Sequence, residues 1–323
     1  MSAVPSPLTG YVRAVLPKRR TAIARPGTVP EAVAVAPPAV ARPERLRRYR
    51  ELCGLPAEGR PEAELPLLWP QTAAFPLTLG LLARRDFPVP LPGLVHVANE
   101  VERLRTLPVG GPLGLRVWRG RPFPHPRGTV FPVHTEALAD DVVVWRSVAE
   151  YLRRGLVAVD TAVDRAVAGS GAAPRALKSA SEDSPIQGEF AAAADVGRAY
   201  GAVSGDRNPI HLFALTARPF GYRRAIAHGM WTAARAFGAL EAAHAAGPAP
   251  GPSPMAGSLW ARVEFRAPVL LPARLTLAAG PAERDGSEAV QHDAGRLVLA
   301  VTDAVTGRSH LRAELRPLPP SSP

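Results

Sequence analysis

The residues whose types best suit chemistry lie together between Tyr200 and Met230. Asp206 stands two positions before an Asn208-Pro209 pair, and His211 follows that pair closely. Asparagine is a favoured N-cap and proline fits the first helical position, so the pair predicts the start of a short helix. This tight geometry brings the carboxylate and the imidazole towards one point in space. An acid/base pair held in this way can position a water molecule and pass a proton.

A second chemical feature follows at Ala227-His228-Gly229-Met230, where a long Ala-rich helix is predicted to begin. Free backbone N–H groups at a helix start, aided by the helix dipole, can stabilise a developing oxyanion. Gly229 has no side chain, so a ligand carbonyl can approach its backbone closely. The segment therefore predicts an oxyanion-binding N–H beside the acid/base pair.

Each of these residues alone also has a purely structural interpretation. Asp206 and Asn208 can serve as capping groups, and His211 as a hydrogen-bonded helical histidine. For a single residue that interpretation is favoured by roughly three to one. The joint order of acid, cap, histidine and glycine-opened helix reverses these odds and favours a functional site.

The elements that must position these residues are read from hydrophobic periodicity. Alternation is clearest in residues 258–267, where Leu259, Ala261, Val263 and Phe265 share one face of a predicted strand. The predicted helices cover residues 43–53, 69–84, 196–204 (capped by Asp195 and ended by Gly205), 208–217 and 228–246. The predicted strands cover residues 93–105, 113–119, 127–137, 142–154, 258–267, 273–279, 296–303 and 308–316. A long helix followed by successive antiparallel strands occurs twice, which predicts an α+β fold with a sheet curling round each helix.

The motif residues resemble the hydratase motif of MaoC-like proteins, which include (R)-specific enoyl-CoA hydratases and 3-hydroxyacyl-carrier-protein dehydratases. The matching segments are Ser204-Gly205-Asp206, Asn208-Pro209-Ile210-His211 and Ile226-Ala227-His228-Gly229-Met230. The resemblance is strong over residues 190–316 and weaker over 44–160, and it implies the hot dog fold. The whole plan resembles actinobacterial dehydratases with two hot dogs, so we expect a double hot dog with a degenerate N-terminal half. That half contains no Asp-x-Asn-Pro-x-His, so one active site per chain is expected.

The resemblance implies a role for each residue of the motif. Asp206 and His211 hold the water that adds to C3 of a trans-2-enoyl thioester, and either can be the formal base. The Gly229 N–H binds the thioester oxygen. Supporting roles fall to Asn208, Ser204, Gly205 and His228. Candidates for the acyl pocket, each of which also suits plain core, are Pro209, Ile210, Phe220, Tyr222, Met230 and Trp231.

One residue departs from the family pattern. Arg207 stands where the family often has an aromatic or apolar residue. The side chain either points to solvent, which we favour in so arginine-rich a chain, or meets a phosphate of coenzyme A or phosphopantetheine.

Composition divides the chain into segments that we predict as domains. A stretch of small and polar residues broken by Gly and Pro marks a linker at 168–186. The remaining segments are an N-terminal arm or loosely packed first strand (1–42), a degenerate hot dog (43–167), a catalytic hot dog (187–317) and a disordered tail (318–323).

Charge and cysteine content exclude several classes of protein. The 323 residues contain one cysteine, Cys53, which excludes an internal disulfide framework and a Cys-rich metal site. The net charge is +11, and all but two of the 39 basic residues are arginine. No basic helix interleaved with aromatics is present, so nucleic acid is not an expected partner. A basic surface suits acyl-CoA or an acidic acyl carrier protein.

The apolar stretch at residues 65–83 is long enough to span a bilayer, but three prolines and a glutamine interrupt it. We therefore expect a buried helix and no membrane span. No continuous apolar segment follows the basic residues near the start, so a cytoplasmic protein is expected.

The favoured function is that of a hydro-lyase that hydrates enoyl thioesters without a metal or redox cofactor, coenzyme A or phosphopantetheine entering only as part of the substrate. The alternative is an idle acyl-thioester-binding or scaffold subunit that pairs with a partner hot dog. Metal hydrolysis through His211, His228 and His244 is disfavoured, because the last two stand sixteen residues apart along one helix. Carrier type, acyl chain length, pathway and oligomeric state (monomer or homodimer) stay open.

Overall fold

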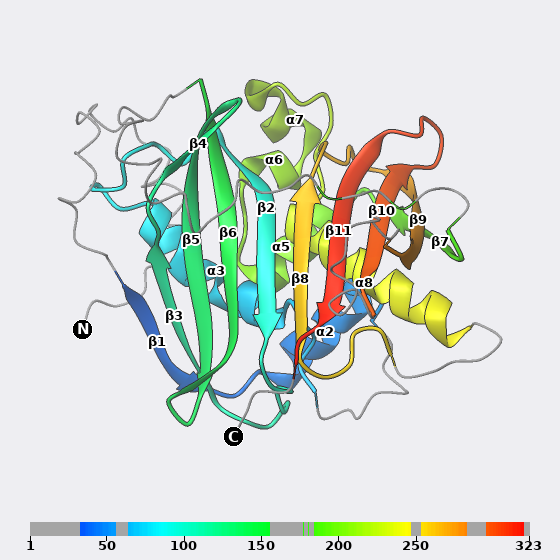
Figure 1. Ribbon diagram of the computed structural model, residues 1–323. Coiled ribbons are helices and arrows are strands. Elements are labelled where there is room, and N and C mark those ends of the chain that lie inside the picture. The colour runs from blue at the N-terminus through cyan, green and yellow to red at the C-terminus, as the bar shows by residue number, and fades with distance from the viewer. Residues whose placement is uncertain are drawn as a thin grey trace.

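The computed structural model describes residues 33–55, 64–155, 177, 180, 184–246, 253–282 and 295–319. Within these ranges every strand joins one antiparallel sheet of eleven strands (Figure 1). The strands are β1 (Ala34–Ala39), β2 (Leu94–Arg103), β3 (Leu113–Arg119), β4 (Phe123–His125), β5 (Gly128–Ala139), β6 (Val142–Arg154), β7 (Ile186–Ala192), β8 (Leu259–Phe265), β9 (Ala273–Pro281), β10 (Leu297–Asp303) and β11 (Ser309–Pro317). The helices are α2 (Pro43–Cys53), α3 (Trp69–Leu82), α5 (Val196–Ser204), α6 (Pro209–Leu212), α7 (Ala214–Ala217), the short 3-10 helix η1 (Arg218–Phe220) and α8 (Gly229–Ala245).

The order of strands repeats between the two halves of the chain. Across the sheet the order is β1-β3-β5-β6-β2 and then β8-β11-β10-β9-β7, while β4 pairs with β5 alone. Each half thus begins with an outer strand, continues into a long helix, and returns as four antiparallel strands, to which the N-terminal half adds the short β4. The halves meet where β2 pairs with β8, for example at Val101 opposite Ala261. The cavity described below lies at this junction.

The two long helices lie on the same side of the sheet (Figure 1). Helix α3 packs against β1, β3 and β5, and helix α8 packs against β7 and β9. Both helices are apolar around most of their circumference, which is the pattern of a helix buried on several sides. Leu77 and Leu81 of α3 and Phe237 and Leu240 of α8 are buried in the core.

Charged residues brace the junction of the halves. Arg262 of β8 donates to Glu150 of β6 at 2.9 Å and to Glu100 of β2 at 3.3 Å. Arg262 and Glu150 are both buried, so the pair is screened little by water. The contact ties one strand of the C-terminal half to two strands of the N-terminal half.

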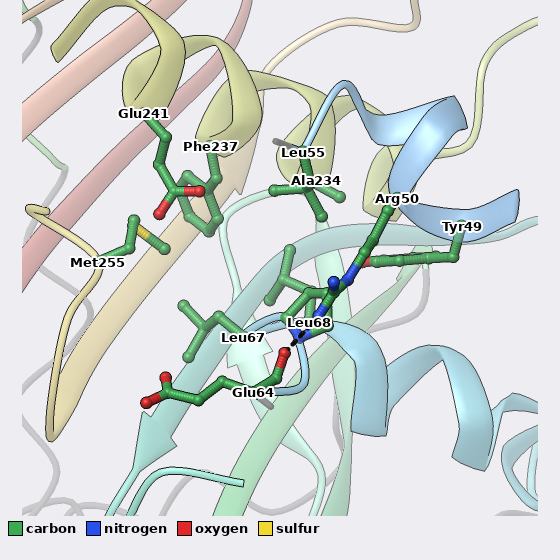
Figure 2. Close-up of a pocket in the computed structure, with 11 residues that line it drawn as sticks. Tyr49, Arg50, Leu55, Glu64, Leu67, Leu68, Ala234, Phe237, Glu241 and Met255 are labelled. Atoms are coloured by element: carbon green, nitrogen blue, oxygen red, sulfur yellow. Dashed lines mark hydrogen bonds between the residues drawn. The ribbon is translucent and has the colours of Figure 1, made fainter. Parts of the chain in front are cut away.

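A small cavity lies between α2, α8 and the segment before α3 (Figure 2). The Arg50 guanidinium donates to the Glu64 carbonyl at its edge, at 2.6 Å. With a volume of about 30 Å³ it holds one or two water molecules and no larger ligand. We assign it to core packing.

Most predicted elements are confirmed, with boundaries that differ by a few residues. The prediction of one helix over residues 208–217 was wrong. Phe213 is extended (φ −145°, ψ 155°) and divides this segment into α6 and α7. Asp195 precedes α5 as predicted, but its side chain makes no capping hydrogen bond. Strands β4 and β7 were not predicted, and Ile186, the last residue of the predicted linker, begins β7.

The segment boundaries themselves stay predictions. Residues 1–32, most of the predicted linker and residues 320–323 lie outside the described ranges. Strand β1 fits the predicted first strand and pairs with β3. Leu318, the first residue of the predicted tail, donates its N–H to the Ser258 carbonyl at 3.0 Å. In the described part of the chain, no helix combines the length and apolarity that crossing a membrane requires.

Candidate active site

The loop after α5 is held by a chain of short-range hydrogen bonds. Gly205 ends the helix with a φ of 82°, a left-handed conformation that glycine adopts without steric cost. The Ser204 hydroxyl then accepts from the Asp206 N–H at 3.1 Å, and Asp206 Oδ1 accepts from the Asn208 N–H at 3.2 Å. The loop thereby fixes the direction of the Asp206 carboxylate, whose side chain is 19% exposed.

Asn208 and Pro209 start α6 as the sequence predicts. The Asn208 side chain accepts from the Ile210 N–H at 3.4 Å, and Pro209 occupies the first helical position. His211 follows in the same turn and is buried. Its Nδ1 lies 2.8 Å from the Ile226 carbonyl, which can only accept, so Nδ1 carries the proton. Nε2 of His211 is left with a lone pair.

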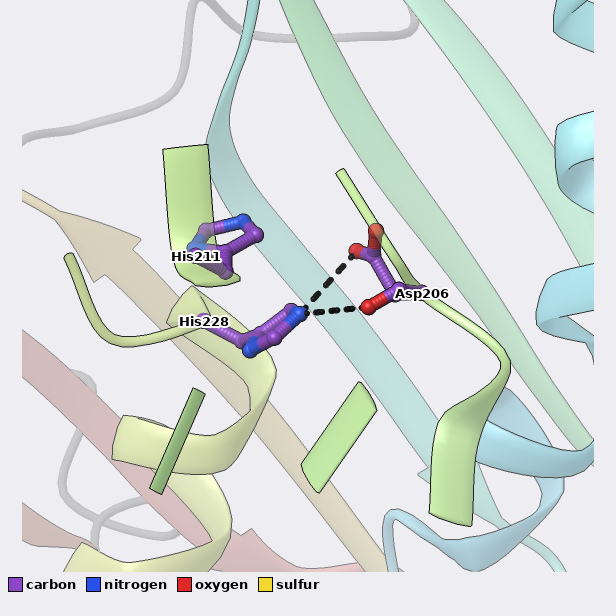
Figure 3. A group of neighbouring side chains, drawn as sticks. All are labelled: Asp206, His211 and His228. Atoms are coloured by element: carbon purple, nitrogen blue, oxygen red, sulfur yellow. Dashed lines mark hydrogen bonds and ion pairs between the residues drawn. The ribbon is translucent and has the colours of Figure 1, made fainter. Parts of the chain in front are cut away.

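His228 precedes α8 and closes the site from the other side. Its Nε2 lies 3.0 Å from the Asp206 carbonyl and 3.7 Å from Asp206 Oδ2. The His211 and His228 rings stack at 3.7 Å between centroids, with an angle of 26° between their planes. Figure 3 shows the two imidazoles side by side with the Asp206 carboxylate facing His228.

Burial keeps both imidazoles neutral. The pKa of His211 is lowered to about 3, mainly by burial and also by the neighbouring His228, while the Asp206 carboxylate acts in the opposite direction. Burial also lowers the pKa of His228, although Asp206 acts in the other direction. Neutral His211 can accept a hydrogen bond from a water molecule or a hydroxyl through Nε2.

These groups open into a cavity of about 230 Å³. Of the predicted site residues, the cavity is lined by Ser204, Asp206, Asn208, Ile210, His211, Tyr222, His228, Gly229 and Met230. Gly229 is the first residue of α8, so its N–H belongs to the helix start that has no intrahelical acceptor.

Four predicted residues lie elsewhere. Trp231 is buried, and its indole N–H donates to the Leu52 carbonyl at 2.9 Å, so it packs α8 against the end of α2. Phe220 is 40% exposed on the short helix η1. Gly205 and Pro209 shape the loop and do not line the cavity. Helical rotation explains Trp231, because Met230 and Trp231 point about 100° apart on one helix.

The N-terminal half supplies the other wall of the cavity, which the motif analysis missed. Phe75, Leu79 and Leu82 come from α3, and Leu94, Val95 and His96 come from β2. This wall is mainly apolar and suits an acyl chain. None of these residues has a local sequence signature, since their position depends on the pairing of β2 with β8.

Comparison with known proteins agrees with this geometry. Residues 180–300 match the MaoC-like domain family. The chain carries a MaoC-like domain. A 3-hydroxyacyl-thioester dehydratase X of Mycobacterium tuberculosis is 29% identical over 276 residues, covering 85% of this chain and 86% of that protein.

Solved structures of MaoC-like proteins are similar to this chain over most of its length. The crystal structure of HtdX of Mycobacterium tuberculosis has a TM-score of 0.64 and 26% identity, covering 89% of this chain and all of that one. A MaoC-like dehydratase from Phytophthora capsici has the same TM-score with 19% identity, covering 90% of this chain and 96% of that one. The likeness extends beyond the MaoC-like domain into the N-terminal half. The fold is therefore that of MaoC-like hot dog proteins.

The site of the MaoC-like domain also contains three groups able to bind a metal ion. One ligand atom each from Asp206, His211 and His228 lie within 4.8 Å of one another. Ligands to one ion direct their lone pairs to a common point, whereas stacked imidazoles direct theirs along nearly parallel planes. His228 Nε2 is moreover occupied as a donor to the Asp206 carbonyl. The arrangement fits hydrogen bonding to water better than metal coordination.

Proposed function

We propose that this protein is a hydro-lyase that reversibly hydrates trans-2-enoyl thioesters to (R)-3-hydroxyacyl thioesters. The observation that carries the proposal is that Asp206, His211 and Gly229 line one cavity whose other wall is apolar. The site thus combines an acid, a neutral imidazole and a helix-start N–H at the head of a channel for an acyl chain. The M. tuberculosis relative named as a 3-hydroxyacyl-thioester dehydratase supports the same reaction class.

In the proposed mechanism, Asp206 and His211 hold the water between them. The lone pair on His211 Nε2 accepts one hydrogen bond, and the Asp206 carboxylate accepts the other and receives the proton. The water oxygen bonds to C3 and a proton adds to C2, so one molecule of water enters without any change in oxidation state. The Gly229 N–H donates to the thioester oxygen and stabilises the enolate that forms between these two events.

The two halves of the chain have different roles in the proposed function. We propose a double hot dog in which each long helix is the central helix of one unit, and in which the N-terminal unit is degenerate. The mirrored strand order on either side of the β2–β8 junction supports this arrangement. One site per chain follows, because only the C-terminal unit contains the Asp206–His211 motif.

The carrier of the acyl group is coenzyme A or an acyl carrier protein, both of which present phosphates. Arg127, Arg154 and Arg266 are exposed residues that line the cavity, where they suit such anions. Neither a metal nor a redox cofactor has a step in this mechanism. The cytoplasmic location and the choice between monomer and homodimer stay predictions.

The test is loss of enoyl-thioester absorbance with crotonyl-CoA and with a longer trans-2-enoyl-CoA. Asp206→Asn is expected to lower turnover by about 10²–10⁴-fold, because the amide cannot take the proton. Asp195→Asn, on an exposed carboxylate without a capping bond, is the matched control and is expected to retain wild-type turnover. Full activity of Asp206→Asn would contradict the mechanism.

The same assay distinguishes the proposed hydro-lyase from the alternative function, an idle binding or scaffold subunit. Wild-type protein that binds acyl thioesters but consumes neither an enoyl-CoA nor an enoyl acyl carrier protein would indicate an idle binding or scaffold subunit. The Asp206–His211 pair argues against this reading, since binding alone requires neither group.

A further inference from the structure

The segment of residues 207–224 leaves the cavity wall at Asn208 and returns to it at Tyr222. Between these points the chain forms α6, α7 and η1, at the end of the molecule where β2 begins and β8 ends (Figure 1). The Thr216 hydroxyl donates to the Pro209 carbonyl at 2.6 Å, so α7 folds back on the start of α6. The segment therefore borders the cavity and presents its outer side to solvent.

Three large apolar side chains of this segment are exposed. The exposed fraction is 52% for Phe213, 74% for Leu215 and 40% for Phe220. The other large apolar side chains exposed in the described part of the chain are all valines. The Arg198 guanidinium of α5 lies 4.8 Å from the centre of the Phe213 ring, so a cationic group accompanies the apolar ones. Aromatic side chains and arginines gathered on a surface are typical of protein interfaces.

The same segment is strongly basic. It contains four arginines and no acidic residue, whereas the whole chain has a net charge of +11 over 323 residues. A segment of this length with the average composition of the chain would carry less than one positive charge, so the local charge exceeds the arginine-rich background. The four exposed arginines are Arg207, Arg218, Arg223 and Arg224. Within the ranges that the structure describes, none of them forms an ion pair.

The mouth of the cavity is basic as well. Arg127, Arg154 and Arg266 line the cavity and are exposed, so they suit the phosphate of a pantetheine arm. Arg218 and the three exposed apolar side chains of the segment do not line the cavity. A ligand confined to the cavity leaves them in water. Covering them requires an acyl carrier that has a surface of its own.

We infer that residues 207–224 form a docking surface for an acyl carrier protein with an acidic face. The inference rests on the proposed hydratase function and names the carrier of its substrate. Unpaired arginines attract an acidic partner and fix its orientation, and the apolar side chains between them form the dry centre of the contact. The pantetheine arm of the docked protein enters the cavity past the three arginines at its mouth. Coenzyme A shares that arm and lacks the protein surface.

The test compares one crotonyl group on two carriers. Hydration of crotonyl-CoA and of a crotonyl acyl carrier protein is followed in wild type and in a double variant with Arg218→Glu and Arg223→Glu. We expect kcat/KM for the carrier-protein substrate to fall by about 10–100-fold, because like charges then face each other across the interface. Turnover of crotonyl-CoA is expected to stay close to wild type, because neither arginine lines the cavity.

Two further variants separate contact from charge. Leu215→Ser removes an exposed apolar side chain and is expected to raise KM for the carrier-protein substrate by about threefold to tenfold. Arg105→Glu is the matched control, since Arg105 is exposed and follows the end of β2 that lies away from the cavity. It is expected to change the kinetics of neither substrate. Thermal melting of each variant confirms folding.

The outcomes decide the inference separately from the proposed function. Equal losses with both substrates in the double variant would overturn the inference, and so would wild-type kinetics with the carrier protein in every variant. Wild-type protein that hydrates crotonyl-CoA alone would also overturn it and leave the proposed function standing. A dimer that Leu215→Ser dissociates, with unchanged carrier-protein kinetics, would assign the surface to a second copy of this chain instead. Wild-type protein inert towards both substrates would overturn the proposed function together with the inference.

Discussion

At the scale of single residues, the hydrogen-bond partners decide which nitrogen of each site histidine carries the proton, because a carbonyl oxygen can only accept. The Ile226 carbonyl requires a proton on His211 Nδ1, and the Asp206 carbonyl requires one on His228 Nε2. His211 therefore presents a lone pair, while His228 holds the Asp206 backbone in place. Two stacked histidines thus have different tasks, and the one outside the Asp-x-Asn-Pro-x-His motif is the positioning group.

Substitution of Gly229 tests whether the substrate must approach the backbone closely at the start of α8. A Cβ at this position would lie 3.1–3.2 Å from ring atoms of Phe265, which itself packs against His96. We expect Gly229→Ala to push this ring and to misplace the thioester oxygen, lowering kcat/KM by about 10–100-fold. Enoyl-CoA hydration is the measurement. Wild-type kcat/KM in a folded Gly229→Ala protein would contradict the role of this backbone N–H.

The absence of a metal step is a separate prediction. The stacked rings at Asp206, His211 and His228 suit hydrogen bonding, so we expect enoyl-CoA hydration to be unchanged after extensive treatment with a chelator. Added Zn²⁺ is expected to give no stimulation. Chelator-sensitive turnover that one equivalent of Zn²⁺ restores would instead assign these three residues as ligands.

At the scale of elements, the site depends on how the helix starts and ends are held. Helix α5 ends at Gly205, α6 starts at Asn208, and α8 starts at His228, so three termini converge on Asp206. Helix α8 is fixed in turn by α2, to which Trp231 donates its indole N–H. A change in the contact between α2 and α8 is therefore transmitted to the start of α8.

Replacing glycine by alanine is expected to change the stability of the fold in opposite directions in the two long helices. A Cβ at Gly80 in α3 would meet no atom within 4 Å, so Gly80→Ala is expected to stabilise the fold by about 0.5–1 kcal/mol. A Cβ at Gly238 in α8 would lie 2.4 Å from the Cys53 carbonyl oxygen, so Gly238→Ala is expected to destabilise it by about 1–3 kcal/mol. Chemical denaturation of both variants measures the two changes. Equal effects would contradict the close packing of α2 on α8.

At the scale of the whole molecule, the sheet joins two halves that contribute unequally to one cavity. The C-terminal half supplies the acid, the imidazoles and the helix start, and the N-terminal half supplies the apolar wall and His96. Pairing of β2 with β8 brings these sets together, and Arg262 braces that junction through Glu100 and Glu150. The site therefore requires both halves to be folded.

Buried histidines predict how stability depends on pH. The folded-state pKa values of His96, His211 and His228 lie below their usual value near 6.5, so the unfolded chain binds protons that the folded chain does not. Stability is then full above about pH 7 and falls as the pH drops from 6.5 towards 4, by up to about 1.4 kcal/mol per pH unit for each histidine. Denaturation at pH 7.5, 6 and 5 measures the slope. His96→Phe is expected to reduce it, and a slope equal to that of wild type would contradict the burial of an uncharged His96.

Local sequence patterns were enough to predict the elements and the motif, because both depend on neighbours in the chain. Alternation places β8, and the Asn208-Pro209 start places His211 beside Asp206, within a few residues. Three features could be learned only from the folded chain, because each depends on contacts that local patterns do not encode. Trp231 faces α2, Phe213 interrupts the short helix, and His96 and Tyr151 line the same cavity as Asp206. A lone histidine in an apolar strand has no local signature. Its place in the cavity wall depends on a sheet register between residues more than a hundred positions apart, and contacts at such separation are set by packing of the whole fold.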